Sequence, residues 1–379
     1  MNNPGKRIAS IDVARGLVML LMTVDHVRET FFLQHQVPDP MDPAGTSPAL
    51  FFTRMMAHFC APMFVFLTGL SAWLYAHPPA GRRDATGFLV KRGALLIALE
   101  IVVVNFAWTG TFTPATLYLQ VIWAIGLAML ALALLHRLPL GVLALLGLVI
   151  VGGHNALAGV AFEPGSPASF AWTILEQRGY LAEGPTRIKI SYPVLAWIGV
   201  ILLGYACGPL YARTGSSHAP ALRRRWLALG GALCLLLLAL LRSVDVYGEP
   251  LPWTAQADLL RTVMSFLNFT KYPPSLDFLL LTLGCGLLAL AWLERIDNAA
   301  TRVAAVFGGA PLFYYLLHLY ALLALQRIAA ALFGVARFDV DHVWQLWAIT
   351  ALLAFMLYWP TRRFGRYKRE SGKGWVKYF

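Results

Sequence analysis

Long apolar stretches separated by short polar segments dominate the pattern along this chain. A helix rises about 1.5 Å per residue, so about 20 mostly apolar residues are enough to cross a bilayer. Each such stretch must be helical, because an open strand edge in lipid would leave backbone groups without hydrogen bonds. The fold class predicted is therefore all-α, a polytopic transmembrane helical bundle. About ten segments meet the length requirement: 11–33, 51–76, 88–109, 117–136, 139–157, 192–212, 226–243, 274–293, 308–333 and 343–361.

The connections between these segments alternate in charge. Basic residues collect in every second connection: Lys6, Arg7, Arg82, Arg83, Lys91, Arg92, Arg137, Arg213, Arg223, Arg224, Arg225, Arg295 and Arg302. Acidic residues collect in the others: Asp39, Asp42, Glu163, Glu176, Glu183, Asp245, Glu249, Asp258, Asp339 and Asp341. Lysine and arginine in short loops are retained in the cytoplasm, so the pattern predicts ten spans with both termini cytoplasmic. Residues 1–379 then form a single integral-membrane domain, in which 361–379 is a basic cytoplasmic tail at the lipid headgroups.

Composition supports a membrane protein and excludes other classes. Hydrophobic residues make up 58% of the 379 residues and charged residues only 13%, with a mean hydropathy of +0.63. These values exclude a disordered chain, a disulfide scaffold and an ordinary cytosolic enzyme. The net charge of +12 does not indicate nucleic-acid binding, because the basic residues are spread over many connections. Cys60, Cys207, Cys234 and Cys285 each lie alone in an apolar segment, so no metal site is predicted from them.

Two long outer connections, 158–191 and 244–273, contain short stretches with apolar residues at helical spacing. These stretches are 169–181 and 257–269. Such segments are typical of interfacial or re-entrant helices, so we expect them to cover a cavity that opens away from the cytoplasm.

Polar side chains inside the predicted spans collect in their outer halves. Ionisable groups are costly in a membrane, so the default interpretation is that they face a cavity and function there. At least six spans contribute: Asp25, His26, His58, Glu100, Asn105, Gln120, His154, Asn155, Lys189, Ser191, Tyr192, Lys271, Tyr272 and Asp277, with His318 near mid-membrane. This distribution predicts one hydrophilic site that opens on the extracytoplasmic side.

Structural interpretations remain open for several of these residues. Lone histidines in membranes often bridge helices by hydrogen bonds, which applies to His154 and His318. Asp12 and Arg15 lie three residues apart on one helical face, where an ion pair is the simpler interpretation. Glu100 would be equally satisfied by any basic side chain nearby.

Several sequence strings resemble a known family. RIASIDVARGLVMLLMTVDH (7–26) resembles the opening of transmembrane acyltransferases, because ten residues separate Arg15 from His26, the Arg-x10-His spacing of the acyltransferase-3 group. Four further strings extend a more specific resemblance, to bacterial members of the heparan-alpha-glucosaminide N-acetyltransferase family, over nearly the whole chain. They are HFCAPMFVFLTG (58–69), LQVIWAIG (119–126), KYPPSLDFLLLTLG (271–284) and PLFYYLLHLY (311–320). Animal members differ by having Asn at the position of His26 and Asp at that of His58.

The resemblance implies an acetyl-CoA-dependent acyltransferase in a bacterial cytoplasmic (inner) membrane. It would move an acetyl group from cytosolic acetyl-CoA to a sugar amine or hydroxyl on the extracytoplasmic side. His26 would match the acyltransferase histidine, and Arg15 the arginine of the motif.

The chemistry of acetyl transfer agrees with these residue types. The acceptor must lose a proton as it attacks the thioester, and histidine accepts a proton at neutral pH. Asp25 or Glu100 is the candidate acid that orients the ring of His26, as a carboxylate does in a triad. Arg15, Arg82 and Arg92 are candidates for the CoA phosphates. The remaining polar residues are candidates for binding the acceptor or the oxyanion: His58, Asn105, His154, Asn155, Tyr192, Lys271 and His318.

Two other functional classes are compatible with this pattern. One is a transporter or permease for a small solute or protons, against which we find no inverted repeat and a marked inside–outside asymmetry of polar residues. The other is a structural or assembly protein without catalysis. For the enzyme, direct transfer is preferred and an acetyl-histidine intermediate stays open, whereas the acceptor and the oligomeric state are not predicted.

Overall fold

A computed structural model describes three stretches of the chain: 9–182, 184–212 and 219–379. Lys6, Arg7, Glu183 and Arg213, which contribute to the predicted charge alternation, lie outside the described residues. The described chain is mostly helical. It divides into two compact units, each of which is considered by itself. The prediction of a single domain stays a prediction.

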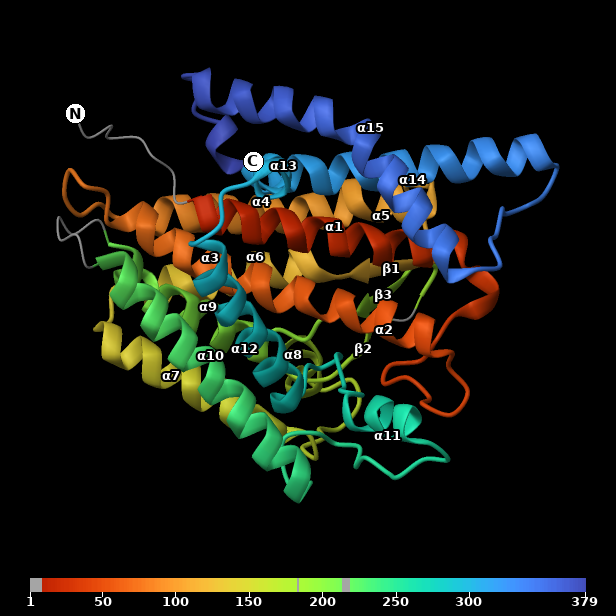
Figure 1. Ribbon diagram of the computed structural model, residues 1–379, viewed down its shortest axis with the longest axis horizontal. Coiled ribbons are helices and arrows are strands. Elements are labelled where there is room, and N and C mark those ends of the chain that lie inside the picture. Colours follow the sequence, from red (N-terminus) through yellow and green to blue (C-terminus); the bar gives the residue numbers. More distant parts are fainter. Residues whose placement is uncertain (1–8, 183, 213–218) are drawn as a thin grey trace. The chain divides into compact units, whose positions relative to one another are not determined.

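The terminal unit comprises Met1–Cys60 and Gly286–Phe379. Its elements are α1 (Ala9–Phe31), η1 (Leu33–His35), α2 (Pro48–Met56), η2 (Ala57–Phe59), α13 (Ala299–Gly309), α14 (Pro311–Phe333), α15 (Val343–Glu370) and η6 (Val376–Tyr378). Within it, α1 contacts α2, α13, α14 and α15 (Figure 1). Most residues of α1 are buried, so its polar side chains are held inside the unit.

The central unit comprises Ala61–Cys285. Its helices are α3 (Cys60–Ala76), α4 (Thr86–Leu99), the π-helical turn η3 (Glu100–Val104), α5 (Asn105–Thr109), α6 (Val121–Leu135), α7 (Leu140–Gly153), η4 (His154–Leu157), α8 (Pro167–Leu175), α9 (Leu195–Ala206), η5 (Gly208–Tyr211), α10 (Ala219–Val244), α11 (Leu259–Phe266) and α12 (Leu276–Leu293), whose last turns belong to the terminal unit. Its strands are β1 (Thr116–Leu119), β2 (Gly179–Ala182) and β3 (Arg187–Ile190).

All ten predicted apolar segments contain a helix. Within the described residues, six helices are long and apolar enough to cross a membrane: Pro48–Ala76, Leu140–Leu157, Pro220–Val244, Leu276–Leu293, Pro311–Phe333 and Val343–Glu370. Val121–Leu135 and Leu195–Tyr211 are shorter apolar helices. α1 lies outside this set because it carries several ionised residues, and α4 because it is short and continues through η3 into α5. The count of ten spans stays a prediction.

The all-α prediction is wrong in one respect, because the central unit contains a three-stranded sheet of order β1-β3-β2 (Figure 1). β1 pairs in parallel with β3, so that Thr116 lies opposite Arg187, and β2 pairs antiparallel with β3. The predicted helices 117–136 and 169–181 are therefore shorter, since β1 replaces the start of the first and β2 the end of the second. Strands of four residues are too short for apolar periodicity to reveal them.

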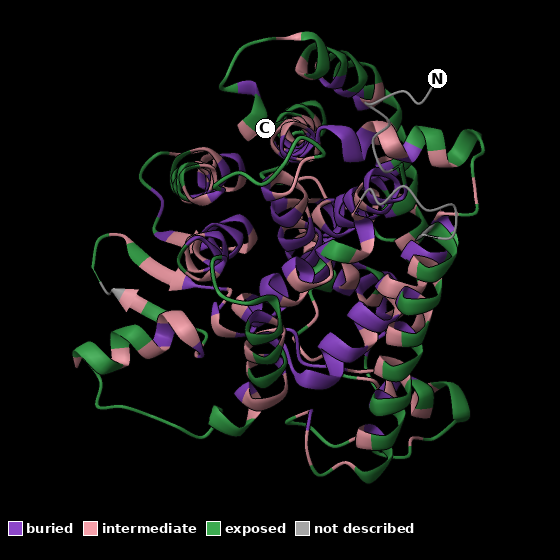
Figure 2. Ribbon diagram, turned by 90° about the vertical axis from the view of Figure 1, so that its left-hand side faces the viewer, coloured by how far each residue is buried: buried purple, intermediate pink, exposed green. Residues whose placement is uncertain are grey.

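Helix α10 displays the surface expected in lipid. Its exposed apolar residues recur every three or four positions and include Leu222, Trp226, Leu229, Leu233, Leu236 and Leu240, all at least half exposed. This spacing places them on one helical face. Figure 2 shows the same division in many helices, with buried residues on one side and exposed residues on the other. An apolar face of this size would be unfavourable in water.

Candidate active site

Two histidines from different helices meet inside the terminal unit. His26 lies on α1 and is half-buried, whereas His318 lies on α14 and is completely buried. The Nδ1 atom of His26 is 2.8 Å from Nε2 of His318, and the two rings are stacked with centroids 5.0 Å apart. The predicted base and one predicted substrate-binding residue are therefore hydrogen-bond partners.

The hydrogen bonds determine which nitrogen of each neutral ring carries the proton. Nδ1 of His318 lies 2.8 Å from the carbonyl oxygen of Tyr314, and a carbonyl can only accept. Nδ1 of His318 is therefore the donor, which leaves its Nε2 as an acceptor. His26 must then donate from Nδ1, so in the neutral ring its Nε2 is the basic nitrogen.

Aromatic residues of α14 support this pair. The ring of Tyr314 stacks on His318 at 5.2 Å between centroids, and Tyr315 contacts His26 edge to face at 6.1 Å. The hydroxyl of Thr23 donates to the carbonyl of Met19, so the hydroxyl of Tyr314 donates to Thr23 across 3.0 Å. Both histidine rings are thus held in one orientation by the contact between α1 and α14.

Asp25, the neighbour of His26, belongs to a separate ion-pair cluster. Its carboxylate accepts from Nη1 of Arg54 at 2.9 and 2.7 Å and from Nε of Arg28 at 3.0 Å. All three residues are buried. Consecutive residues on a helix point about 100° apart, which explains why Asp25 and His26 have different partners. Sequence reasoning missed both arginines, although Arg28 follows Asp25 at the i,i+3 spacing of a helical ion pair.

Two further predicted residues of the terminal unit lie elsewhere. Arg15 pairs with Asp12 at 3.5 Å near the start of α1. This is the ion pair that their spacing favours. His58 is buried on η2, close in sequence to Cys60, whose thiol donates to the carbonyl of Val18 on α1.

Glu100 and Asn105 lie together in the central unit. Glu100 is fully buried in the π-helical turn η3, and its Oε2 accepts from the backbone N–H of Trp123 at the start of α6. The side-chain amide of Asn105 donates to the carbonyls of Glu100 and Tyr118 and accepts from the N–H of Tyr118, each at 2.8 Å. These contacts fasten η3 to β1 and α6, and π-helical turns are frequent at functional sites.

The remaining outer residues form bridges within the central unit. Nε2 of His154 lies 2.7 Å from the carbonyl of Pro274. Oδ1 of Asn155 accepts from the N–H of Leu276 at 2.8 Å. Both contacts tie the end of α7 to the start of α12. The structure therefore supports the helix-bridging interpretation of His154.

Tyr192, Tyr272 and Lys271 form a second local group. The hydroxyls of the two tyrosines are 3.1 Å apart, and the ammonium of Lys271 lies 5.1 Å from the ring centre of Tyr272. Lys271 is almost completely buried. A buried ammonium over an aromatic face is stabilised by the ring quadrupole.

The predicted phosphate ligands of the central unit lie in and just after the connection between α3 and α4. Arg82 is exposed in this connection, and Arg92 lies on α4. Asp84 of the same connection accepts from Nη2 of Arg137 at 3.0 Å. Hydrogen bonds from Thr86, reinforced by Arg137, lower the pKa of Asp84 to about 2. The acid is therefore ionised and partly offsets the local positive charge.

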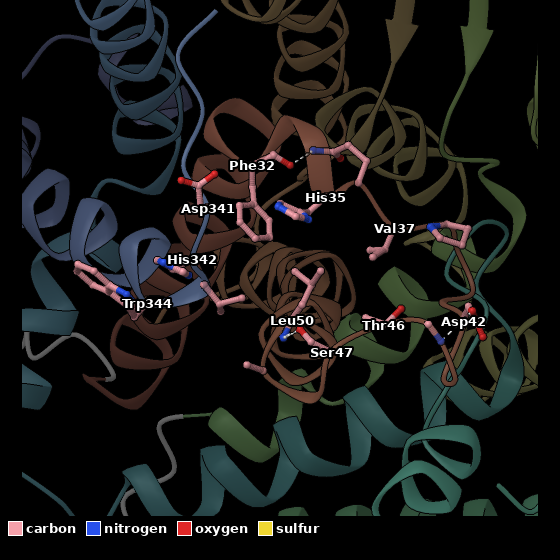
Figure 3. A pocket seen from close by; sticks show the side chains of 15 residues that line it. Phe32, His35, Val37, Asp42, Thr46, Ser47, Leu50, Asp341, His342 and Trp344 are labelled. Carbon is pink, nitrogen blue, oxygen red and sulfur yellow. Dashed lines mark hydrogen bonds between the residues drawn. The ribbon is translucent and has the colours of Figure 1, made fainter. Parts of the chain in front are cut away.

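A pocket of about 790 Å³ lies beyond the C-terminal end of α1. It is lined by the segment that follows α1, by the start of α2 and by the start of α15 (Figure 3). Among the described residues, no group of three or more His, Cys, Asp or Glu side chains is arranged to hold a metal ion.

A model of the protein family described as Heparan-alpha-glucosaminide N-acetyltransferase, catalytic, matches residues 7–238, more than half of the chain. The chain belongs to this family. It is accordingly a helical membrane protein of an acetyltransferase family. Comparison with curated proteins gives no match. The matched region includes His26, whereas His318 lies beyond its end.

Proposed function

We propose that the protein transfers an acetyl group from cytosolic acetyl-CoA to an amine or hydroxyl of a saccharide on the other side of the membrane. The membership of an N-acetyltransferase family supports acetyl transfer. The observation that carries the mechanism is the hydrogen-bonded pair of His26 and His318, because it prepares one imidazole nitrogen as a base inside a membrane helix.

In this proposal, Nε2 of His26 accepts the proton that the acceptor loses as its nitrogen or oxygen attacks the thioester carbonyl. The acetyl–acceptor bond forms, the carbon–sulfur bond breaks, and the thiolate of CoA takes the proton back from His26. His318 accepts from Nδ1–H of His26 throughout, so it also stabilises the imidazolium formed midway. His318 thus plays the role that the carboxylate plays in a Ser-His-Asp triad.

We assign a positioning role, and no catalytic role, to the ion-pair cluster around Asp25. Because Asp25 is occupied by Arg28 and Arg54, we assign it to holding the end of α1 rather than to orienting His26. Glu100 similarly orders the start of α6.

We assign the CoA phosphates to the cytoplasmic ends of the helices. Arg15 precedes His26 by eleven residues, which is about 16 Å along α1. CoA joins its thioester to its phosphates through a long pantetheine arm, so the separation fits a phosphate-binding arginine below the base. Arg82 and Arg92, considered by themselves in the central unit, stay predicted phosphate ligands.

The membrane arrangement belongs to the same proposal. Ten helices cross a bacterial cytoplasmic membrane, with both termini and the basic connections in the cytoplasm. The site on α1 and α14 then opens toward the outside, where the acceptor resides. Arg15 and His26 are the pair that corresponds to the Arg-x10-His motif.

The test is acetyl transfer by purified protein from acetyl-CoA to amino sugars, with the variant His26→Gln. Glutamine retains an amide donor toward His318 but has no base, so we expect the rate to fall by about 100-fold or more while acetyl-CoA binding and the melting temperature persist. Undiminished transfer by His26→Gln would exclude His26 as the base. An acetylated His26 peptide, formed with acetyl-CoA alone, would indicate the two-step route. Accumulation of an unmodified solute in proteoliposomes would instead indicate transport.

A further inference from the structure

The C-terminal part of α15 differs sharply in charge from the part that precedes it. Residues 343–359 contain no charged side chain, and Pro360 follows them inside the helix. From 361 to 379 the only acidic residue is Glu370. The basic residues of this segment are Arg362, Arg363, Arg366, Lys368, Arg369, Lys373 and Lys377. Because α15 continues to Glu370, most of these charges are carried by an ordered helix.

The residues after α15 fold back against it through aromatic contacts. The ring of Phe364 stacks on Phe313 of α14 with the centroids 4.2 Å apart, and it also contacts Phe379 at 6.1 Å. The ring of Trp375 contacts Tyr367 at 6.4 Å and Phe379 at 5.9 Å. The chain therefore ends beside the start of α14 (Figure 1). The basic residues of the helix and of the tail thus belong to one compact part of the terminal unit.

The arginines form a stripe on the exposed side of α15. Thr361 and Gly365 are buried. Arg362, Arg366 and Arg369 are exposed and follow the i, i+4, i+7 spacing that places side chains on one helical face. We define the C-terminal basic surface as the exposed basic residues of this segment: Arg362, Arg363, Arg366, Arg369, Lys373 and Lys377.

Like charges lie next to one another on this surface without an acidic partner. Pairs such as Arg362 with Arg366, or Arg366 with Arg369, destabilise a helix at these spacings. Among the described residues, no carboxylate forms an ion pair with these arginines. The helix dipole favours basic residues in the last turn, which accounts for Arg369 but not for Arg362 and Arg363. The arrangement therefore fits an anion that comes from outside the chain.

Exposed aromatic side chains beside the arginines indicate the kind of anion. Trp359 is 60% exposed, and the guanidinium of Arg362 lies 5.7 Å from its ring centre. Trp375 is 50% exposed on the folded-back tail. Tryptophan is enriched at membrane–water interfaces, where its ring lies at the level of the lipid headgroups. Because Trp359 ends the uncharged stretch of α15, the arginines that follow it are placed where phospholipids carry their phosphates.

We propose that the C-terminal basic surface binds the phosphate groups of anionic phospholipids, such as phosphatidylglycerol, and that these lipids stabilise the terminal unit. Arginine suits this ligand because its planar guanidinium donates two hydrogen bonds to one phosphate. Phe364 lies between the arginines and stacks on α14, so lipid bound here stabilises the packing of α15 against α14. The inference goes beyond the proposed function, and its test requires no acetyl transfer.

The first experiment compares the melting temperature of the full-length protein in nanodiscs of phosphatidylcholine with and without phosphatidylglycerol. Phosphatidylglycerol should raise the melting temperature of wild type, because a ligand that binds the folded state stabilises it. The double variant Arg363→Gln/Arg366→Gln should lose most of this gain. In a detergent titration followed by native mass spectrometry, its affinity for phosphatidylglycerol should fall about tenfold or more, while binding of phosphatidylcholine stays the same.

The control double variant is Arg295→Gln/Arg302→Gln. It removes the same charge from two exposed positions of the same unit, and Arg302 already has an acidic partner, Asp297, at 2.8 Å. It should keep the response of wild type to phosphatidylglycerol. An equal loss of the response in both double variants would overturn the inference, because net charge alone would then determine lipid binding.

Stability without anionic lipid separates lipid binding from packing. In phosphatidylcholine alone, Arg363→Gln/Arg366→Gln should be at least as stable as wild type, since it removes repulsion between like charges. A lower stability there, combined with an unchanged gain from phosphatidylglycerol, would assign the arginines to packing and overturn the inference.

Soluble anions test the choice of a lipid. Inorganic phosphate and an RNA oligonucleotide, each matched to the lipid in total charge, should not displace phosphatidylglycerol from wild type. Trp375→Ala should weaken phosphatidylglycerol binding, whereas Trp292→Ala, at a 61% exposed position away from this surface, should not. Displacement of the lipid by the oligonucleotide would assign the surface to nucleic acid and overturn the inference.

Discussion

A single backbone carbonyl, that of Tyr314, determines the protonation of two histidines. It accepts from His318, which accepts from His26, so the basic nitrogen of His26 is Nε2. A histidine takes the place that a carboxylate occupies in many catalytic sites. This arrangement avoids a second ionised group in a membrane helix, where burying a charge is costly.

Substitution of His318 tests whether it orients the ring of His26. Glutamine can accept from Nδ1–H of His26 through its amide oxygen, whereas leucine cannot. We expect His318→Leu to lower kcat by about 100- to 10,000-fold with little change in KM, as wrong-tautomer variants of triads do. His318→Gln should recover a substantial part of that loss. Equal loss in both variants, with both proteins folded, would assign His318 to packing only.

Glu176, at the end of α8, gives a pH-dependent prediction for stability. Its side chain is buried, and burial raises its pKa from 4.5 to about 8. Between these values the folded protein holds a proton that the unfolded chain has released, so stability falls as pH rises toward 8. Glu176→Gln resembles the protonated acid, and we expect its melting temperature to exceed that of wild type at pH 9 but to match it at pH 5.

Thermal unfolding in detergent at both pH values measures this difference. Glu163→Gln, at an exposed position of the same connection, is the control and should behave as wild type. A Glu176→Gln protein with no advantage at pH 9 would contradict the prediction.

At the residue scale, sequence reasoning found His26 but not its arrangement. The spacing from Arg15 and the preceding acid drew attention to it, and Asp25 was a reasonable partner on that evidence. The actual partner, His318, is 292 positions away, and single-sequence periodicity carries no information on such pairs. Arg54, which pairs with Asp25, was missed for the same reason, because it lies 29 positions away in the sequence.

At the element scale, glycine residues let pairs of helices approach each other closely. A Cβ atom added to Gly16 of α1 would overlap the carbonyl of Ala304 on α13, and one added to Gly308 of α13 would overlap the carbonyl of Asp12. In the central unit, Gly69 of α3 and Gly204 of α9 approach the opposite backbone in the same way. Small residues let membrane helices pack where lipid offers no hydrophobic driving force.

Gly16→Ala should therefore separate α1 from α13. Because the obstructing atoms are backbone, they cannot move aside cheaply, and we expect a loss of about 1–3 kcal/mol or more. Activity should fall as well, since α1 carries His26. Gly152→Ala on α7 is the matched control, because nothing lies within 4 Å of the added atom. Denaturation in detergent compares the two, and equal stability would contradict the packing argument.

The long apolar helices could be predicted from the sequence, whereas the short helix α13 and the sheet could not. Runs of apolar residues long enough to cross a bilayer indicate helix directly, and each of the ten contains one. α13 is short, with Arg302 inside it, so it did not register as a separate element although it packs along α1. The sheet was missed because each strand has only four residues and because β1 lies far along the chain from β3, with which it pairs.

At the scale of the whole molecule, the distribution of charged residues indicates an orientation in the membrane. The connections predicted to face the cytoplasm carry exposed arginines, such as Arg82 and Arg137, and the last turn of α15 carries Lys368 and Arg369. In the proposed orientation, the net charge of +12 marks the cytoplasmic side and requires no polyanionic partner. Asp42 and Asp341, which line the pocket, belong to connections that the proposed orientation places outside the cytoplasm.

The last prediction concerns this orientation. In a variant whose native cysteines are replaced, single cysteines are introduced at exposed positions: Asp84, Glu163, Arg337 and Lys373. A membrane-impermeant maleimide should label the cysteines at 163 and 337 in intact cells, and those at 84 and 373 only after permeabilisation. Four predicted spans separate 163 from 337, so both must lie on one side. Labelling of only one of them would mean an odd number of crossings between them and would overturn the ten-span arrangement, whereas labelling at 84 and 373 alone would reverse it.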